Sequence, residues 1–236
     1  MNRRQFSKIT ALSAMGATSP SLISTVAAST QNSSSRSANE RINLALIGAK
    51  NQGGRVHLPT LVSSDDCQLV AVCDVDSTVQ AEAIQTASAQ YAEQYGKSKY
   101  DGIAGVPDFR DIMGNDDIDA VVIATPDHWH VPIAKAAILA GKDVYVEKPL
   151  SLHIDEGREL VELANKHKKI VQVGSQQRSD ERFVIASEMV RNGLIGEVKH
   201  VEVSIKTRSG NAEAWEAEPI PPELNYNMWL GPAPWS

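Results

Sequence analysis

The residues best suited to chemistry stand directly after two apolar runs. Thr125-Pro126-Asp127-His128-Trp129-His130 follows residues 121–124, and Glu147-Lys148-Pro149 follows residues 144–146. A lysine that is desolvated beside a positive charge can accept the proton of a hydroxyl group as a general base. A lysine at the end of a strand also commonly forms an ordinary surface salt bridge. We therefore take Lys148 as the candidate catalytic residue, with a surface salt bridge as the alternative interpretation.

The segment between these two motifs predicts the element that positions them. Residues 121–124 form an unbroken apolar run that is typical of a strand covered on both faces. Residues 131–139 carry apolar side chains at helical spacing, and Gly141 stands where a glycine ends a helix. With a second strand at 144–146 this makes a βαβ unit. Because ligands of parallel sheets bind beyond the carboxyl ends of the strands, we expect both motifs to face one crevice.

A glycine-rich turn follows the first predicted strand, residues 42–47. Gly48-Ala-Lys-Asn-Gln-Gly53 has the frame of the dinucleotide motif G-x-G-x-x-G, with Lys50 in the second glycine position. A side chain there must point away from the pyrophosphate or the loop must shift, although a lysine can contact phosphate as a point charge. The alternative is a plain glycine-rich turn.

The next apolar run, residues 69–73, ends at Asp74. An acidic side chain at this place accepts hydrogen bonds from the adenosine ribose and disfavours a 2′-phosphate. No Arg or Lys occurs in residues 75–95 to attract such a phosphate. We therefore predict NAD as the cofactor, with NADP less favoured. The candidate cofactor-binding residues are Gly48, Lys50, Asn51, Gln52, Gly53, Asp74, Thr125, Pro126, His130, Glu147, Lys148 and Gln176.

Strands alternate with helices over residues 41–178, which predicts an α/β fold with a doubly wound parallel (Rossmann) sheet. The other predicted elements are helices at 77–95, 154–167 and 180–192, a short helix after Asp108, a loop at 97–106 and a strand at 170–173. Residues 199–207 alternate polar with apolar side chains, which is typical of a strand with one solvent-exposed face. We expect residues 179–236 to begin an α+β open-sheet domain that is incomplete, so the chain looks like a truncated, N-terminal portion of a longer protein.

Composition narrows the class of function. The 236 residues are 42% hydrophobic and carry a formal net charge of -6 without a basic stripe, which argues against nucleic acid. Cys67 and Cys73 end one apolar run and would lie about 20 Å apart in a strand, too far for a disulfide. His128 and His130 lack an evident third ligand, so we predict no metal site.

The N-terminus resembles a twin-arginine export signal. Arg3 and Arg4 precede a weakly apolar segment that ends at Ala27-Ala28. We expect a signal peptide over 1–28, a Ser/Asn-rich linker over 29–40, the Tat export machinery as a partner and a periplasmic location. An ordinary basic tail is the alternative.

Several motifs together resemble the Gfo/Idh/MocA oxidoreductase family. They are Ile47-Gly48-Ala49 with Gly53, Cys73-Asp74-Val75-Asp76, Ala124 to His130, Val146 to Leu150, Gln172 to Arg178, and Met228-Trp229-Leu230-Gly231-Pro232. The resemblance implies an NAD(P)-binding Rossmann domain, followed by an α/β domain that carries substrate and oligomer contacts. Lys148 matches the family's catalytic lysine in Glu-Lys-Pro. The family pattern also includes a histidine in the second domain, but no histidine follows His200.

Three functions remain open. The first is an exported oxidoreductase that transfers a hydride between the nicotinamide cofactor and a sugar, sugar derivative or cyclic polyol, and forms a homo-oligomer at full length. The second is an NAD-dependent glycoside hydrolase of the same superfamily. The third, favoured by the missing histidine, is a dinucleotide-binding protein without activity.

Overall fold

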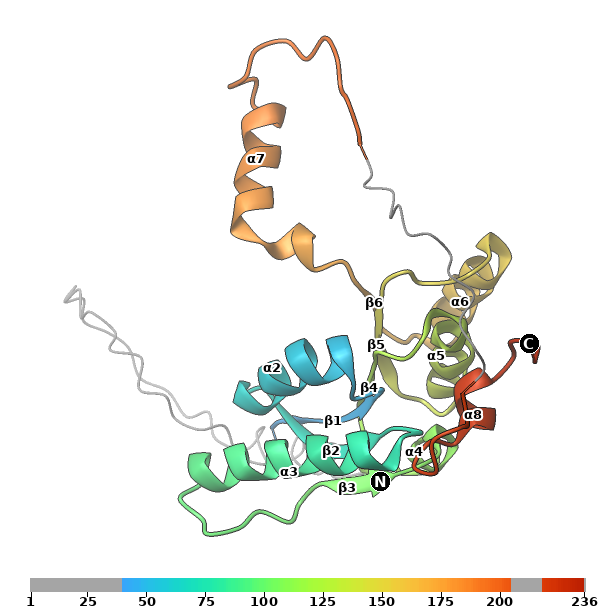
Figure 1. The fold of residues 1–236 in the computed structure, drawn as a ribbon. Helices are drawn as coiled ribbons and strands as arrows, with labels where there is room; N and C mark the ends of the chain where they lie inside the picture. Colours follow the sequence, from blue (N-terminus) through green and yellow to red (C-terminus); the bar gives the residue numbers. More distant parts are fainter. Residues whose placement is uncertain (1–39, 205–217, 236) are drawn as a thin grey trace, which may run out of the picture. The chain divides into compact units, whose positions relative to one another are not determined.

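A six-stranded sheet organises the computed structural model, which describes residues 40–204 and 218–235. The strands pair in the order β3-β2-β1-β4-β5-β6, and every neighbouring pair is parallel. This is the order of a doubly wound sheet, whose direction of winding reverses between β1 and β4 (Figure 1). The strands are β1 Ile42–Ile47, β2 Cys67–Cys73, β3 Ala104–Val106, β4 Ala120–Ile123, β5 Asp143–Glu147 and β6 Val171–Gly174.

Two apolar clusters cover the two faces of the sheet. Successive residues of a strand point to opposite faces, so Leu46 belongs to one cluster and Ile47 to the other. On the Ile47 side the sheet packs against α4 Phe109–Met113, α5 His130–Leu139 and α6 Ile154–His167; on the Leu46 side it packs against α2 Leu58–Ser63 and α3 Ser77–Gln94. Burial on both faces explains why residues 44–47 of β1 and all of β4 are continuous apolar runs.

The remaining helices are short or lie late in the chain. They are η2 Gly53–His57, which is π-helical, the 3₁₀ turns η3 Asp127–Trp129 and η4 Gln176–Ser179, and the α-helices α7 Glu181–Arg191 and α8 Tyr226–Leu230. Asp76 caps α3 by accepting bonds from the backbone N–H groups of Thr78 and Val79, and Asp108 caps α4 in the same way. These side chains satisfy amides that the first turn of a helix leaves open.

The predicted α/β class and doubly wound sheet are confirmed, as is the short helix after Asp108. The predicted strand at 199–207 is wrong over 199–204, which form no strand, and 205–207 lie outside the described residues. Alternation alone cannot hold a strand that has no neighbouring strand to pair with. The expected loop at 97–106 ends in the short strand β3, which pairs with β2. The signal predicted over 1–28 lies outside the described residues.

Both cysteines are free and buried, which confirms that they form no disulfide with each other. Burial, with a smaller contribution from the carboxylate of Asp74, raises the pKa of the Cys73 thiol to about 12. Because the thiolate is the reactive form, this shift makes Cys73 a poor nucleophile, although it lines the candidate site. Among the described residues, none of the helices has both the length and the apolar character needed to cross a membrane.

Candidate functional site

A cleft of about 590 Å³ opens at the carboxyl ends of β1, β2, β4 and β5. Its volume is in the range of small-molecule and cofactor sites. Four segments predicted from the sequence border it: the glycine-rich turn, the end of β2, the segment after β4 and the Glu147-Lys148 pair. The predicted site residues that line it are Gly48, Lys50, Asn51, Gln52, Asp74, Thr125, Pro126, His130, Glu147 and Lys148. The expectation that both strand-end motifs face one crevice is therefore confirmed.

The glycine-rich turn needs its glycines for close approach. Gly48 has φ +87°, and a Cβ atom on it would lie 2.6 Å from the carbonyl oxygen of Ala124. A Cβ on Gly53 would lie 1.9 Å from the carbonyl oxygen of Gly48. Lys50 itself is exposed, and the turn bends at Asn51, which has φ +43°. The chain thus accommodates a lysine at the second glycine position by bending one residue later.

Asp74 joins the end of β2 to this turn. Its Oδ2 accepts a 2.7 Å bond from the backbone N–H of Ala49, and its Oδ1 accepts a 3.0 Å bond from that of Asp76. A carboxylate offers about four acceptor positions, so Asp74 retains acceptor capacity on the cleft side. The predicted role at a ribose hydroxyl group is compatible with these bonds.

The segment after β4 is braced by His130. This ring is 1% exposed, with Nδ1 2.6 Å from the carbonyl oxygen of Pro149 and Nε2 3.0 Å from that of Thr125. It therefore links the two strand-end motifs. The buried Oγ1 of Thr125 has no hydrogen-bond partner among the described residues. Since buried hydroxyl groups are nearly always paired, this atom is a candidate partner for a polar group of a ligand in the cleft.

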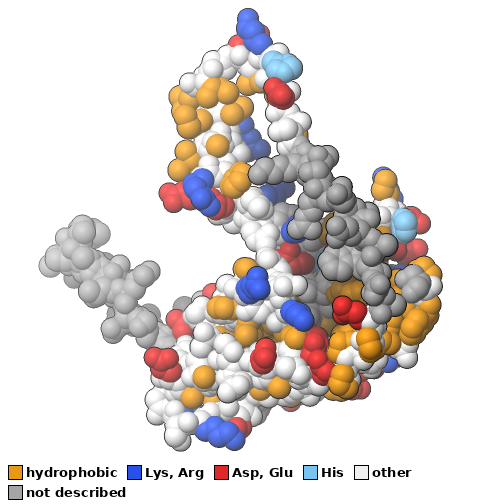
Figure 2. Space-filling view, in the orientation of Figure 1, with side chains coloured by type: hydrophobic (Ala, Val, Ile, Leu, Met, Phe, Trp, Pro, Cys, Tyr) orange, Lys and Arg blue, Asp and Glu red, His pale blue; other side chains and the backbone are white. Residues whose placement is uncertain are grey.

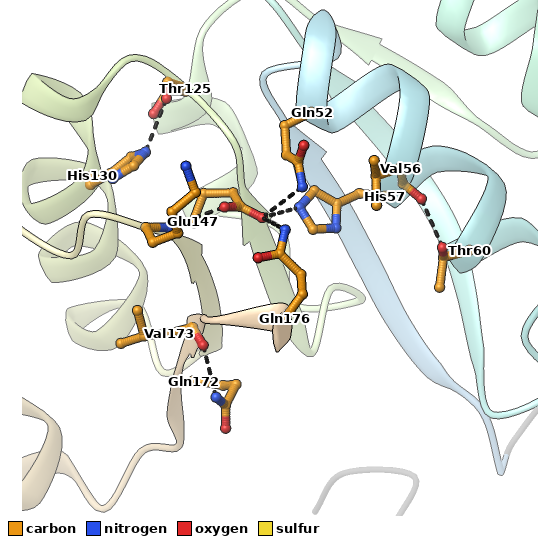
Figure 3. A network of polar contacts seen from close by, with 11 residues as sticks. Gln52, Val56, His57, Thr60, Thr125, His130, Glu147, Gln172, Val173 and Gln176 are labelled. Carbon is orange, nitrogen blue, oxygen red and sulfur yellow. Dashed lines mark hydrogen bonds and ion pairs between the residues drawn. The ribbon is translucent and has the colours of Figure 1, made fainter. Parts of the chain in front are cut away.

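Glu147 and Lys148 differ sharply in environment. Glu147 is 4% exposed and accepts bonds from Gln52, His57 and Gln176 (Figure 3). Lys148 is exposed at the border of the cleft. Gln176, predicted as a cofactor-binding residue, does not line the cleft, and its amide is turned toward Glu147. His57 was not identified as a site residue from the sequence. It lies four residues after the glycine motif, and at that position an α-helix would not direct its side chain toward β5.

A late segment of the chain supplies one wall of the cleft. We call residues 221–231 the strap. Its bonds to the sheet domain run from Ser77 N to Glu223 O (3.0 Å), from Asn225 N to Val75 O (2.8 Å), from Trp129 Nε1 to Met228 O (2.7 Å), and from His128 Nε2 to Trp229 O (2.9 Å). Pro221, Glu223, Leu224, Met228 and Trp229 line the cleft. Residues 212–236 have no periodicity from which this placement could be predicted.

The His128-x-His130 pair is used for packing. His128 donates to the strap and His130 contacts two carbonyl oxygens. Within 40–204 and 218–235 no three His, Cys, Asp or Glu side chains gather in a group that could hold a metal ion.

The charges around the cleft are mixed. Asp74, Asp76 and Glu223 line one part of it, while Lys50 and Lys148 also border it. On the face shown in Figure 2, basic side chains are scattered among acidic ones and form no continuous stripe. The cleft therefore suits a ligand with both polar and ionic groups better than a polyanion such as nucleic acid.

The features of the cleft agree with what a dinucleotide requires. A backbone turn kept open by glycines can approach a pyrophosphate closely, the Asp74 carboxylate has free acceptor positions, and the Thr125 hydroxyl group is unpaired. These residues would hold the cofactor.

Comparison with known proteins gives the same assignment. Residues 42–175 match the model of GFO_IDH_MocA, described as an oxidoreductase family with an NAD-binding Rossmann fold. Two curated relatives are named as glycosyl hydrolase family 109 proteins. One, from Shewanella sp. (strain ANA-3), is 34% identical over 167 residues, covering 70% of this chain and 35% of the relative. The other, from Saccharopolyspora erythraea, is 32% identical over 162 residues, covering 68% of this chain and 34% of the relative.

Solved structures are also similar. The myo-inositol 2-dehydrogenase of Lactobacillus plantarum is 29% identical with a TM-score of 0.56, over 67% of this chain and 43% of that one. The scyllo-inositol dehydrogenase of Lactobacillus casei, solved with NAD(H) and scyllo-inositol, is 25% identical with a TM-score of 0.56, over 66% of this chain and 43% of that one. The chain spans about a third of the length of the curated relatives described above.

Proposed function

Because the chain belongs to the Gfo/Idh/MocA oxidoreductase family, with an NAD-binding Rossmann fold, we propose that it serves hydride transfer between NAD and a sugar, sugar derivative or cyclic polyol. The observation that carries the proposal is the cleft itself, which Lys148 shares with the glycine-rich turn. The similarity to two inositol dehydrogenases supports a cyclic polyol or a related carbohydrate as the substrate class.

The chain's own residues account for binding and proton transfer. The turn around Gly48 would receive the pyrophosphate, Asp74 the adenosine ribose, and the Thr125 hydroxyl group a polar group of the cofactor. NAD, when bound, supplies the acceptor of the hydride. Lys148 is exposed in the open cleft, and bound cofactor and substrate would cover it. It would then take the proton from the substrate hydroxyl group as its carbon is oxidised, a role that typically contributes about 10²–10⁴-fold to a rate.

The direct test is an assay of the protein against a panel of inositols and free sugars. The proposal expects NADH to form, seen as absorbance at the reduced nicotinamide band, with at least one cyclic polyol or sugar. If NAD binds but no member of the panel and no glycoside reacts, the chain is better described as a dinucleotide-binding protein without activity.

An NAD-dependent glycoside hydrolase is the second candidate, and the names of the curated relatives favour it. Such an enzyme oxidises the sugar transiently and restores the cofactor in each cycle. Aryl glycosides distinguish the two functions, because release of the aryl group without net NADH supports the hydrolase. Net NADH from a free sugar supports the dehydrogenase.

We expect NAD to bind more tightly than NADP. Asp74, Asp76 and Glu223 line the cleft, and unit charges about 8 Å apart repel by roughly 2 kcal/mol at an effective dielectric constant of about 20. A 2′-phosphate would meet this repulsion. Titration should therefore give a Kd for NADP about 30-fold above that for NAD, and D74N should narrow the difference. D101N, at an exposed carboxylate paired with Lys99, is the control. Tighter binding of NADP to the unaltered protein would contradict the expectation.

We also propose export through the twin-arginine pathway. Arg3-Arg4 and the small residues Ala27-Ala28 support it. N-terminal sequencing of the protein from the cell envelope fraction checks this, and a chain that still begins at Met1 would refute it.

A further inference from the structure

A π-helical turn determines which side chains of the first helical segment face the sheet. Gly53–His57 is π-helical and continues into α2. In an α-helix, residues five apart point about 140° away from each other, since each residue turns the helix by about 100°. The π-turn, in which residues five apart are hydrogen-bonded, brings Gln52 and His57 to one side. Both reach Glu147 at the end of β5 (Figure 3).

The two glycines of the π-turn explain why its backbone lies so close to the segment that follows β1. A Cβ atom on Gly53 would lie 1.9 Å from the carbonyl oxygen of Gly48, and one on Gly54 would lie 2.3 Å from that of Ala49. The two glycines therefore let the π-turn pack directly on the segment after β1. π-Helical turns are rare in proteins, and those that occur are often found at functional sites.

The Glu147 carboxylate is the meeting point of three chain segments. Its Oε1 accepts bonds from Nε2 of His57 at 2.8 Å, Nε2 of Gln176 at 3.3 Å and Nε2 of Gln52 at 3.4 Å. Its Oε2 accepts a 3.1 Å bond from the backbone N–H of Lys148. Figure 3 shows the three donors converging on one oxygen.

The number of hydrogen-bond donors around Glu147 limits its capacity to accept a further bond from a ligand. One carboxylate oxygen has about two acceptor positions, so three donors leave none on Oε1 for a ligand. The other oxygen faces the main chain of the candidate catalytic residue. His57 is only 9% exposed and its ring also lies edge-on to Tyr145, with centroids 5.2 Å apart, so its donor has little freedom.

We propose that Gln52, His57 and Gln176 position Lys148 by fixing the Glu147 carboxylate, which in turn holds the backbone of Lys148. The inference rests on the proposed function, since Lys148 is the proton acceptor there. His57 and Glu147 are positioning residues: they act through Lys148 and contribute little to the affinity for NAD.

A substitution at Gly174 offers an independent way to displace the Glu147 carboxylate. Gly174 pairs in register with Glu147, and a Cβ atom on it would lie 3.0 Å from both Cδ and Oε1 of Glu147 and 2.9 Å from the hydroxyl oxygen of Tyr145. The variant G174A therefore displaces the carboxylate without removing a donor. It should reproduce the effect of losing His57.

The test measures how well NAD shields Lys148 from an amine reagent, which needs no knowledge of the substrate. The protein is treated with trinitrobenzenesulfonate with and without saturating NAD, and the labelling rate of Lys148 is read by peptide mass spectrometry. In the unaltered protein NAD should slow labelling by about tenfold. In H57L and G174A the slowing should fall below about threefold, with the Kd for NAD changed by less than about threefold, because a small displacement is enough to disrupt a site.

Two variants make the result specific. H57Q retains an N–H donor and should restore the shielding, whereas R55A, an exposed position of the same turn, should leave it unchanged. Turnover of any polyol that the unaltered protein oxidises should fall about 100-fold in H57L at saturating cofactor and substrate. Circular dichroism confirms folding of each variant.

The outcomes separate the inference from the proposed function. If the unaltered protein does not bind NAD, the proposed function fails. If it binds NAD and shields Lys148, but H57L and G174A shield it equally well, the positioning role is refuted. A large loss of NAD affinity in both variants also refutes it, because the network would then belong to the cofactor site itself.

Discussion

Replacing Lys148 by alanine should lower turnover by about 10²–10⁴-fold, the range that a positioned general base contributes. Lys148 follows the buried Glu147 at the end of β5 and borders the cleft. Its loss removes the acceptor for the hydroxyl proton but none of the groups expected at the pyrophosphate or the ribose. The affinity for NAD should therefore change by less than about tenfold, which titration of the same preparation measures.

Lys135 provides the matched control for this experiment. It is a lysine on α5 that pairs with Glu159 at 2.7 Å and does not line the cleft. K135A should retain full turnover, because an exposed ion pair of this kind contributes at most about 1 kcal/mol to stability. Undiminished turnover in K148A would remove Lys148 from the mechanism and return it to the surface salt-bridge interpretation.

The second large effect is expected at the glycine-rich turn. In G48A the new methyl group would lie 2.6 Å from the carbonyl oxygen of Ala124, at a φ of +87°. An unfavourable backbone conformation alone costs about 1–3 kcal/mol, and the clash forces the turn away from β4. Because the turn is the expected pyrophosphate site, the Kd for NAD should rise at least about 100-fold. Titration by calorimetry or by nicotinamide fluorescence checks this.

Gly96 provides a control that separates the effect of backbone strain from the effect of a clash at the cofactor site. It has φ +61°, but a Cβ atom there would meet nothing within 4 Å. G96A should therefore lower the free energy of unfolding by about 1 kcal/mol through backbone strain, with unchanged NAD binding. If G48A and G96A bind NAD equally well, the turn after β1 is not where the cofactor binds.

The sheet and most of the cleft could be predicted from sequence because the signals are local. Val121 and Ile123 lie in an apolar run that reads as a strand covered on both faces. Gly48 and Asp74 stand at fixed positions relative to the ends of their strands. The carboxyl-end rule for parallel sheets then places such residues together without knowledge of side-chain contacts.

The parts that were missed depend on contacts between distant residues. His57 reaches Glu147 only because the turn is π-helical, and no propensity scale for single residues anticipates that change. Alternation in residues 199–207 predicted a strand, but pairing is a property of two segments and not of one. Gln176 was placed correctly at a strand end, yet its direction depends on the Glu147 carboxylate.

The strap has a consequence for how long a cofactor stays bound. The connection of about 45 residues between β6 and Pro221, treated as a flexible chain, costs roughly 3 kcal/mol in chain entropy to close. The four N–H···O hydrogen bonds of the strap are worth roughly 1 kcal/mol each, and Arg110 adds a weaker contact to Met228 Sδ at 3.8 Å, so these polar contacts nearly balance the closure cost. A dinucleotide that touches both the strap and the sheet would tip this balance, and by reciprocity the docked strap would tighten the dinucleotide by the same amount. Slow escape of the cofactor would then be set by undocking of the strap, so residence time would become a property of a segment that carries no reacting group.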